Sequence, residues 1–166
     1  TALGRALKEK YGVKKGDRVA LIMRNFPEWS ITFWAIAAIG GVVVPLNAWG
    51  TGPELEYGIS ESGSKVVILD HERLDRIRPH LKALGLDGLI AVRTPADELG
   101  VAEAFETIVG KPEDYAKLPA DALPDPGLVP EDDATIFYTS GTTGKPKGAL
   151  GTQRNICTNQ PTNRST

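Results

Sequence analysis

The stretch "RVALIMRNFPEWSITFWAIAAIGGVVVPLN", residues 18–47, contains the pattern that decides the fold. Two short and nearly continuous apolar runs, 18–23 and 42–47, are typical of strands that are covered on both faces. Between them lies a helix-like segment that opens at Pro27 and stops at Gly40, because proline suits the first helical turn and glycine suits the position after the last. A strand, a helix and a strand in this order predict a right-handed crossover between parallel strands.

The helix-like segment is apolar on most of its surface. One stripe at helical spacing carries Trp29, Phe33, Ile36 and Ile39, and the opposite face is mostly alanine and isoleucine. We therefore expect a largely buried helix, with Trp34 also in the core, and no cofactor is implied by these aromatic residues. Trp49, which follows the second apolar run, is expected in a loop or at an interface.

The same alternation continues after this unit. Thr51 and Glu54 have the spacing of a capping box, and Gly63 stands where that helix would stop. The remaining pattern predicts a strand at 65–69, a helix at 73–84 that is interrupted or bent at Pro79, a strand at 88–92 and a strand at 134–140. Repeated strand and helix predict an α/β fold, a mainly parallel sheet with helices on both faces.

Residues 93–133 have a weaker pattern. Their last part, "LPADALPDPGLVPEDD" at 118–133, is rich in proline and aspartate, which favours an exposed connection over a second domain. We therefore expect residues 1–166 to belong to one domain. The acidic group Glu131, Asp132 and Asp133 is interpreted as a solvated turn rather than a metal site.

Composition excludes several classes of protein. The chain has 166 residues, of which 41% are hydrophobic and 24% charged, and this is average for a globular domain rather than a disordered one. A net charge of −2 gives no general attraction to nucleic acid. We expect no signal peptide and no transmembrane segment. A single cysteine, Cys157, excludes an internal disulfide and favours a reducing, cytoplasmic setting, while the oligomeric state stays open.

The chemistry-bearing stretch is "YTSGTTGKPKGA", residues 138–149, at the end of the last predicted strand. Loops at the carboxyl ends of strands are where open α/β sheets bind ligands. Its glycines allow backbone N–H groups to converge on an anion, its hydroxyl residues donate hydrogen bonds, and Lys145 and Lys147 add positive charge. The stretch contains no carboxylate, so it suits a polyphosphate. It is not a Walker A loop, because Pro146 stands where that motif counted from Gly141 needs its second glycine.

The order of residues 138–148 resembles the phosphate-binding signature of the adenylate-forming superfamily, which includes acyl-CoA synthetases, luciferases and the adenylation domains of peptide synthetases. The segments "GDRVALIMRNFPEW", "AIAAIGGVVVPLN" and "ELEYGISESGSKVVI" resemble successive N-terminal segments of the same family. The resemblance implies that residues 1–166 are the N-terminal part of the large, AMP-binding domain, with the remainder of that domain and a C-terminal domain absent from this chain.

The resemblance implies a ligase that activates a carboxylic acid, a fatty acid being one candidate, with ATP and Mg²⁺ as an acyl-adenylate, and then transfers the acyl group to coenzyme A. No residue of this chain is expected to act as the catalytic base, and the fragment alone is expected to be inactive. The family's phosphate contacts map onto Thr139, Ser140, Gly141, Thr142, Thr143, Gly144, Lys145, Lys147 and Gly148, with the main contacts expected from Ser140, Thr142, Thr143 and Lys147.

One departure concerns Gln153, which stands where many relatives have histidine at the edge of the acyl site. Two alternatives stay open at this stage, an adenylation domain that charges a carrier protein and a non-catalytic nucleotide-binding module. His71 and His80 lie in a charged helical segment without a second ligand at a convincing spacing, so we expect solvated histidines rather than metal ligands.

Overall fold

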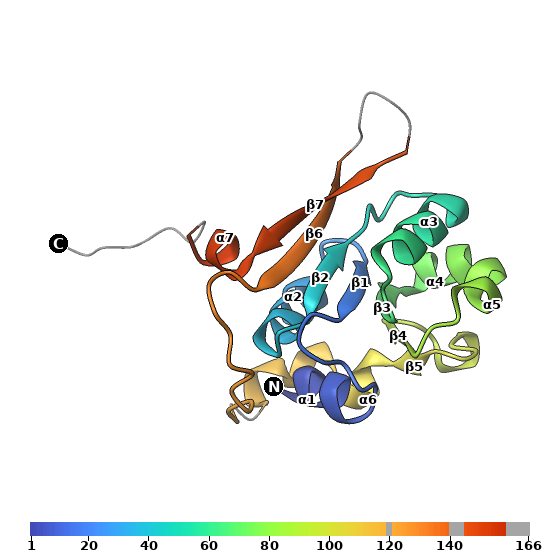
Figure 1. Cartoon of the computed structure of the whole chain (residues 1–166). Coiled ribbons are helices and arrows are strands. Elements are labelled where there is room, and N and C mark those ends of the chain that lie inside the picture. The colour runs from blue at the N-terminus through green and yellow to red at the C-terminus, as the bar shows by residue number, and fades with distance from the viewer. Residues whose placement is uncertain (119–120, 140–144, 159–166) are drawn as a thin grey trace.

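The structure is a computed structural model that describes residues 1–118, 121–139 and 145–158 (Figure 1). Helices and strands alternate through most of this part of the chain. The helices are α1 (Ala2–Glu9), α2 (Pro27–Ala38), α3 (Gly52–Ser62), α4 (His71–Ile77), α5 (Leu81–Leu84), α6 (Phe105–Val109) and α7 (Gln153–Thr158). The strands are β1 (Arg18–Ile22), β2 (Val42–Pro45), β3 (Val66–Asp70), β4 (Gly88–Val92), β5 (Glu103–Ala104), β6 (Asp133–Thr139) and β7 (Lys147–Thr152), and short 3₁₀ turns are η1 (Arg78–His80), η2 (Ala96–Glu98) and η3 (Pro112–Lys117).

The strands form one sheet in the order β5-β4-β3-β1-β2-β6-β7. All neighbouring pairs from β5 to β6 are parallel, and only the pair β6 and β7 is antiparallel. Helix α2 connects β1 to its parallel neighbour β2, as residues 18–47 predict. The expected α/β fold with a mainly parallel sheet is therefore confirmed.

Side chains alternate along the strands between two hydrophobic cores. On one face, Val19 and Leu21 of β1 belong to a cluster with residues of α1, α2 and α6. On the other face, Ala20 and Ile22 belong to a cluster with residues of α3 and α4. Figure 1 accordingly shows α3, α4 and α5 grouped together, apart from α1 and α6. Strands buried on both faces explain the continuous apolar runs in the sequence.

Helix α2 is largely buried, with one correction. Phe33 and Ile36 are buried as expected, but the side chain of Trp34 is 47% exposed, so its assignment to the core is wrong. Trp34 follows Phe33 by one position, about 100° around the helix, so it lies on a different and more exposed side of α2 than Phe33. The two rings pack edge to face with centroids 5.2 Å apart.

The predicted helix boundaries hold where local chemistry defines them. The backbone N–H of Thr51 donates to Oε2 of Glu54 at 2.7 Å, which completes the capping box of α3, and Gly63 ends the helix with a φ of 66°. Pro79 lies in η1, between α4 and α5, so the predicted helix is interrupted there. Pro45 is the last residue of β2, one of the positions that proline allows.

The segment 93–133 is more structured than its sequence predicts. Strand β5 pairs with β4, and Phe105 of α6 is fully buried in the core. A strand of two residues and a helix of five are too short to produce a recognisable period. Residues 121–130 form no regular element and are mostly exposed, as an exposed connection requires.

An ion pair between a buried glutamate and a partly exposed arginine fixes this segment to the first crossover. Glu28, in the first turn of α2, is fully buried and lies 3.1 Å from Nη2 of Arg93. The hydroxyl of Tyr115 donates to the same carboxylate at 3.1 Å, and burial together with this carboxylate raises the pKa of Tyr115. Arg93 has a φ of 52°, an uncommon backbone conformation for a residue with a Cβ. Arg93 and Tyr115 are 65 and 87 residues from Glu28 along the chain, so no local pattern indicates that they are its partners.

Across the described residues, no helix combines the length and the apolar character that crossing a bilayer would need.

Candidate functional site

The predicted phosphate loop joins β6 to β7. Thr139 is the last residue of β6, and Lys147 and Gly148 are the first two residues of β7. Thr139 stands opposite Lys147 in the antiparallel ladder, so the pair closes the base of the loop. Ser140, Gly141, Thr142, Thr143 and Gly144 lie outside the described residues. The structure thus places Thr139, Lys145, Lys147 and Gly148 around the carboxyl end of β6, the sheet edge where ligands are expected.

Strand β7 was not predicted from the sequence. Its residues "KGALGT" contain two glycines and lack an apolar alternation, because most of the strand is exposed. Gly148 has a packing reason that the phosphate-loop interpretation did not include. A Cβ at this position would lie 2.7 Å from Cγ2 of Ile136 on β6, so the close approach of the two strands depends on glycine.

Helix α3 contacts the segments on both sides of the loop. The hydroxyl of Tyr57 donates to the carbonyl oxygen of Pro146 at 3.4 Å, and Nζ of Lys145 lies 4.9 Å from the centroid of the Tyr57 ring. On the other side of the loop, the hydroxyl of Tyr138 donates to the carboxylate of Glu61. Burial, together with this hydrogen bond to a carboxylate, raises the pKa of Tyr138.

A small cavity of about 110 Å³ lies at this junction. Its walls come from the carboxyl end of β2, from α3 and from the two sides of the loop base, and they include Leu46, Asn47, Tyr57, Tyr138 and Pro146. The arrangement therefore presents the ammonium group of Lys145 at the carboxyl edge of the sheet, next to a partly apolar depression. Such a site can bind anionic oxygen atoms through charge-assisted hydrogen bonds.

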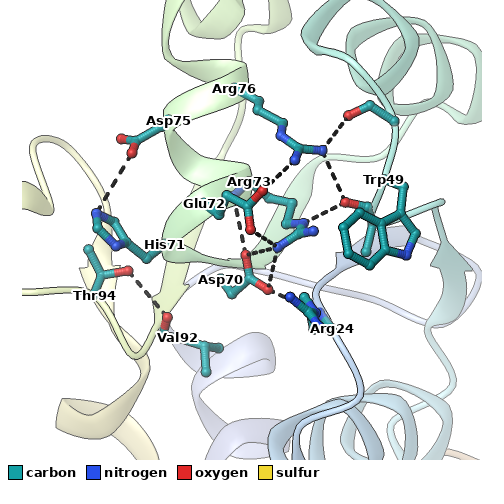
Figure 2. A network of polar contacts seen from close by, with 12 residues as sticks. Arg24, Trp49, Asp70, His71, Glu72, Arg73, Asp75, Arg76, Val92 and Thr94 are labelled. Carbon is teal, nitrogen blue, oxygen red and sulfur yellow. Dashed lines mark hydrogen bonds and ion pairs between the residues drawn. The ribbon is translucent and has the colours of Figure 1, made fainter.

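A second polar cluster lies at the same edge of the sheet, at the carboxyl ends of β1 and β3 (Figure 2). Asp70 caps α4 by accepting from the backbone N–H of Arg73 at 3.2 Å, and it also accepts from the backbone N–H of Arg24 at 3.0 Å. The side chain of Arg73 is 1% exposed, with Nη1 3.3 Å from Oδ1 of Asp70 and Nε donating to the carbonyl of Ala48 at 2.6 Å. This cluster fixes the loops that follow β1 and β2 to the start of α4.

Trp49 covers this cluster from the solvent side. It is 66% exposed, which agrees with its expected place in a loop. Its ring centroid lies 4.9 Å from Cζ of Arg24 and 5.6 Å from Cζ of Arg73, so two guanidinium groups contact one aromatic residue (Figure 2). Among the described residues, Nη2 of Arg73 is buried without a hydrogen-bond partner.

The two histidines are paired with carboxylates instead of being fully solvated. Nε2 of His71 lies 2.7 Å from Glu98 and 3.7 Å from Asp75, and Nδ1 of His80 lies 2.6 Å from Glu56. The sequence did not reveal these partners because Glu98 and Glu56 are distant along the chain. Arg78 also pairs with Asp75 at 2.9 Å, and the ligand atoms of His71, Asp75 and Glu98 lie within 4.8 Å of one another.

Two residues of the acidic group 131–133 form ion pairs with basic side chains. Asp132 forms an ion pair with Lys15 at 2.6 Å, and its side chain accepts from the backbone N–H of Val129 at 2.7 Å. Glu131 pairs with Arg154 on α7. Gln153, the first residue of α7, is 9% exposed, and its Nε2 has no hydrogen-bond partner within the described part of the chain.

Comparison with known proteins defines the class to which this fold and loop belong. A sequence model of the family described as "AMP-binding enzyme" matches residues 1–164. The chain belongs to this family, the adenylate-forming superfamily that its loop resembles.

Individual relatives are acid:CoA ligases. A long-chain-fatty-acid–CoA ligase of Mycobacterium tuberculosis is 35% identical over 147 residues, which are 87% of this chain and 26% of that protein. A long-chain-fatty-acid–CoA ligase of Escherichia coli is 32% identical over 173 residues, 92% of this chain and 30% of that protein. A feruloyl-CoA synthase of Amycolatopsis is 34% identical over 148 residues, 89% of this chain and 26% of that protein.

Solved structures agree with these relatives. An anthranilate–CoA ligase in complex with anthranoyl-AMP has a TM-score of 0.79 at 27% identity, over 93% of this chain and 28% of that chain. An inhibitor-bound N-terminal domain of FACL13 from Mycobacterium tuberculosis has a TM-score of 0.63 at 32% identity, over 94% of this chain and 37% of that chain. The chain thus spans between a quarter and about a third of the length of the relatives and structures named here.

Proposed function

We propose that this chain is the N-terminal part of the AMP-binding domain of an ATP-dependent acid:CoA ligase, and that its loop between β6 and β7 binds the phosphates of ATP. The observation that carries the proposal is the position of this loop. Lysine residues and a glycine-rich sequence follow a strand at the carboxyl edge of a parallel sheet, in a chain that belongs to the AMP-binding family.

The loop is proposed to hold the β- and γ-phosphates through donors only. The proposed contacts are Thr139, Ser140, Gly141, Thr142, Thr143, Gly144, Lys145, Lys147 and Gly148, with Ser140, Thr142, Thr143 and Lys147 making the main ones. Lys145 and Lys147 fit this role because both are exposed beside the loop base. Residues 139–148 include no carboxylate, so Mg²⁺ would be held here by phosphate oxygens, with the hydroxyl groups of the loop as the only side-chain oxygens it offers.

The chemistry that follows is chiefly electrostatic. A carboxylate attacks the α-phosphate, the bond to the β-phosphate breaks, and negative charge grows on the departing pyrophosphate. Donors that already point at this group stabilise the charge as it develops. A carboxylate is nucleophilic at neutral pH, so no residue of the loop needs to accept a proton, and the chain contributes by positioning the two reactants.

Coenzyme A is the proposed acyl acceptor. The relatives carry names of ligases or synthases that form CoA thioesters, and this favours coenzyme A over a carrier protein. Their acids include long-chain fatty acids and ferulate, so the proposed substrate is a carboxylic acid with an apolar or aromatic body, and fatty acids are one class of it.

Carboxylate-dependent exchange of labelled pyrophosphate into ATP tests the proposal. The complete product of the gene is assayed with short-chain, long-chain and aromatic acids, each with and without coenzyme A. Exchange that needs both an acid and ATP, followed by acyl-CoA formation when coenzyme A is added, is the expected result. A folded protein that binds ATP but gives no exchange with any acid would leave the non-catalytic nucleotide-binding module as the better explanation. Transfer to a phosphopantetheine protein but not to coenzyme A would favour the carrier-charging alternative.

A further inference from the structure

We propose that Tyr57 of α3 is a positioning residue for the phosphate loop, which it holds by placing the Lys145 ammonium group and the Pro146 carbonyl. The inference rests on the proposed function, since nucleotide phosphate is the anion that Lys145 would meet. Tyr57 itself lies outside the loop sequence, and no motif around it in the sequence indicates this role.

Two contacts from one side chain reach two consecutive loop residues. The Tyr57 ring lies under Nζ of Lys145, 4.9 Å from the ring centroid, within the range of a cation–π interaction. The Tyr57 hydroxyl donates to the carbonyl oxygen of Pro146 at 3.4 Å. Together these two contacts fix the position of the Lys145 side chain and of the backbone that leads into β7.

The cation–π contact suits a lysine that must also bind an anion. An ammonium group has three N–H donors, and contact with a ring face on one side leaves the donors on the far side available to phosphate oxygens. A carboxylate partner would instead neutralise the charge and occupy a donor. Within the part of the chain that the structure describes, Lys145 forms no ion pair with a carboxylate.

Helix α3 also holds the other side of the loop. Glu61 lies four residues after Tyr57, hence on the same face of the helix, and it accepts a hydrogen bond from Tyr138 of β6. One helical face therefore contacts Tyr138 at the end of β6 and the consecutive residues Lys145 and Pro146 that lead into β7.

The helix is itself a rigid support. Its first turn is closed by the capping box of Thr51 and Glu54, and Leu55 and Ile59 are buried in the core with 2% and 1% exposure. Tyr57 lies between these two buried residues in the sequence and is half-buried on the face toward the loop. A rigid helix of this kind can hold the Lys145 side chain in one place, which lowers the cost of binding an anion there.

The test is a double-mutant cycle between Tyr57 and Lys145 in the complete gene product, read as the ATP KM in pyrophosphate exchange. Tyr57→Leu is expected to raise this KM by about two- to fivefold, the size of an exposed cation–π contact, with little change in kcat. Tyr57→Phe keeps the ring, so its ATP KM is expected to stay close to that of the wild-type protein. In the Lys145→Met background, Tyr57→Leu should have a clearly smaller effect, because only the hydrogen bond to Pro146 is then left to lose.

Tyr11 provides a matched control, because its ring also lies near a lysine, with Nζ of Lys10 5.7 Å from the centroid, far from the loop. Tyr11→Leu should leave the ATP KM unchanged even where it lowers the melting temperature. Tyr57→Gln replaces Tyr57→Leu in the cycle if the leucine variant does not fold. An unchanged ATP KM in a folded Tyr57 variant, or effects of Tyr57 and Lys145 that simply multiply, would overturn the inference.

Failure of the proposed function is distinguishable from failure of this inference. If the wild-type protein exchanges pyrophosphate but the Tyr57 variants keep its ATP KM, only the role of Tyr57 is wrong. If no acid supports exchange, the same cycle is measured by calorimetric titration with ATP. Weaker ATP binding by the Tyr57 variants, with the same coupling between Tyr57 and Lys145, then supports positioning of Lys145 by Tyr57. Equal ATP affinities of the Tyr57 variants and the wild-type protein, or no ATP binding by the wild-type protein, would overturn it.

Discussion

Asp70 links three segments of the chain at the carboxyl edge of the sheet. It ends β3, caps α4 and accepts from the backbone N–H of Arg24. It also faces the guanidinium of Arg73, whose side chain is 1% exposed. A buried arginine needs its counter-charge, because an uncompensated charge in the interior is costly.

Asp70→Asn is expected to destabilise the fold by about 3–5 kcal/mol, since it keeps the capping oxygen but leaves Arg73 without its buried partner. Glu72→Gln is the matched control. Glu72 pairs with the same arginine at 2.9 Å from an exposed position, so its loss should destabilise the fold much less than the loss of Asp70. Urea unfolding of the two variants checks the difference, and equal losses would contradict the account of Asp70.

Residues whose partners lie far away along the chain could not be assigned their roles from the sequence. Glu28 is buried, but in the sequence it cannot be told apart from any glutamate that favours the first turn of a helix. Its partners Arg93 and Tyr115 come from distant segments of the chain. Gly148 was assigned to phosphate binding from its motif, and the steric contact with Ile136 became visible only when β7 was placed beside β6. In each case the deciding contact joins residues that no local period brings together.

At the scale of elements, α1 and β5 are joined by a polar contact that responds to pH. Glu103 of β5 forms an ion pair with Lys10 at 2.7 Å and accepts a hydrogen bond from the hydroxyl of Tyr11. Both donors favour the ionised carboxylate and lower the pKa of Glu103. The resulting stability is present above the unfolded pKa of about 4.3 and is lost as pH falls through the lower folded pKa.

Amide protection in α1 and β5 is therefore expected to fall below about pH 4, and Glu103→Gln should remove this dependence. Hydrogen exchange between pH 3 and pH 6 measures it, with β1 and β3 in the centre of the sheet as the internal reference. A loss of protection at low pH that is the same in the Glu103→Gln variant would contradict the assignment to this carboxylate.

Elements with a strong local signature were predictable, and weak ones were not. Burial on both faces requires apolar residues, so apolar runs identify β1, β3 and β4 in the sequence. The capping box requires particular residues at a fixed spacing, so it identifies the start of α3. Strands β5 and β7 leave none. Strand β5 has two residues, and β7 is an exposed edge strand whose pairing with β6 depends on glycine.

For the whole molecule, the sheet order places the proposed phosphate loop and the Asp70 cluster at the same edge. Parallel strands end on one side, so β1, β2, β3 and β6 bring their following loops together there. The loop motif could be located from sequence because its order is specific. Its support by Tyr57 and Glu61 could not, because α3 and the loop are about 80 residues apart and only the fold makes them neighbours.

The central claim is that this loop binds the phosphates of ATP in an acid-activating enzyme. The most direct measurement is the ATP dependence of acid-stimulated pyrophosphate exchange in Lys147→Ala, with Lys82→Ala on the exposed side of α5 as a charge-matched control. Loss of one charge-assisted contact should lower kcat/KM for ATP by about 10- to 100-fold in Lys147→Ala and leave the control unchanged. An ATP dependence in Lys147→Ala equal to that of the wild-type protein would contradict the claim.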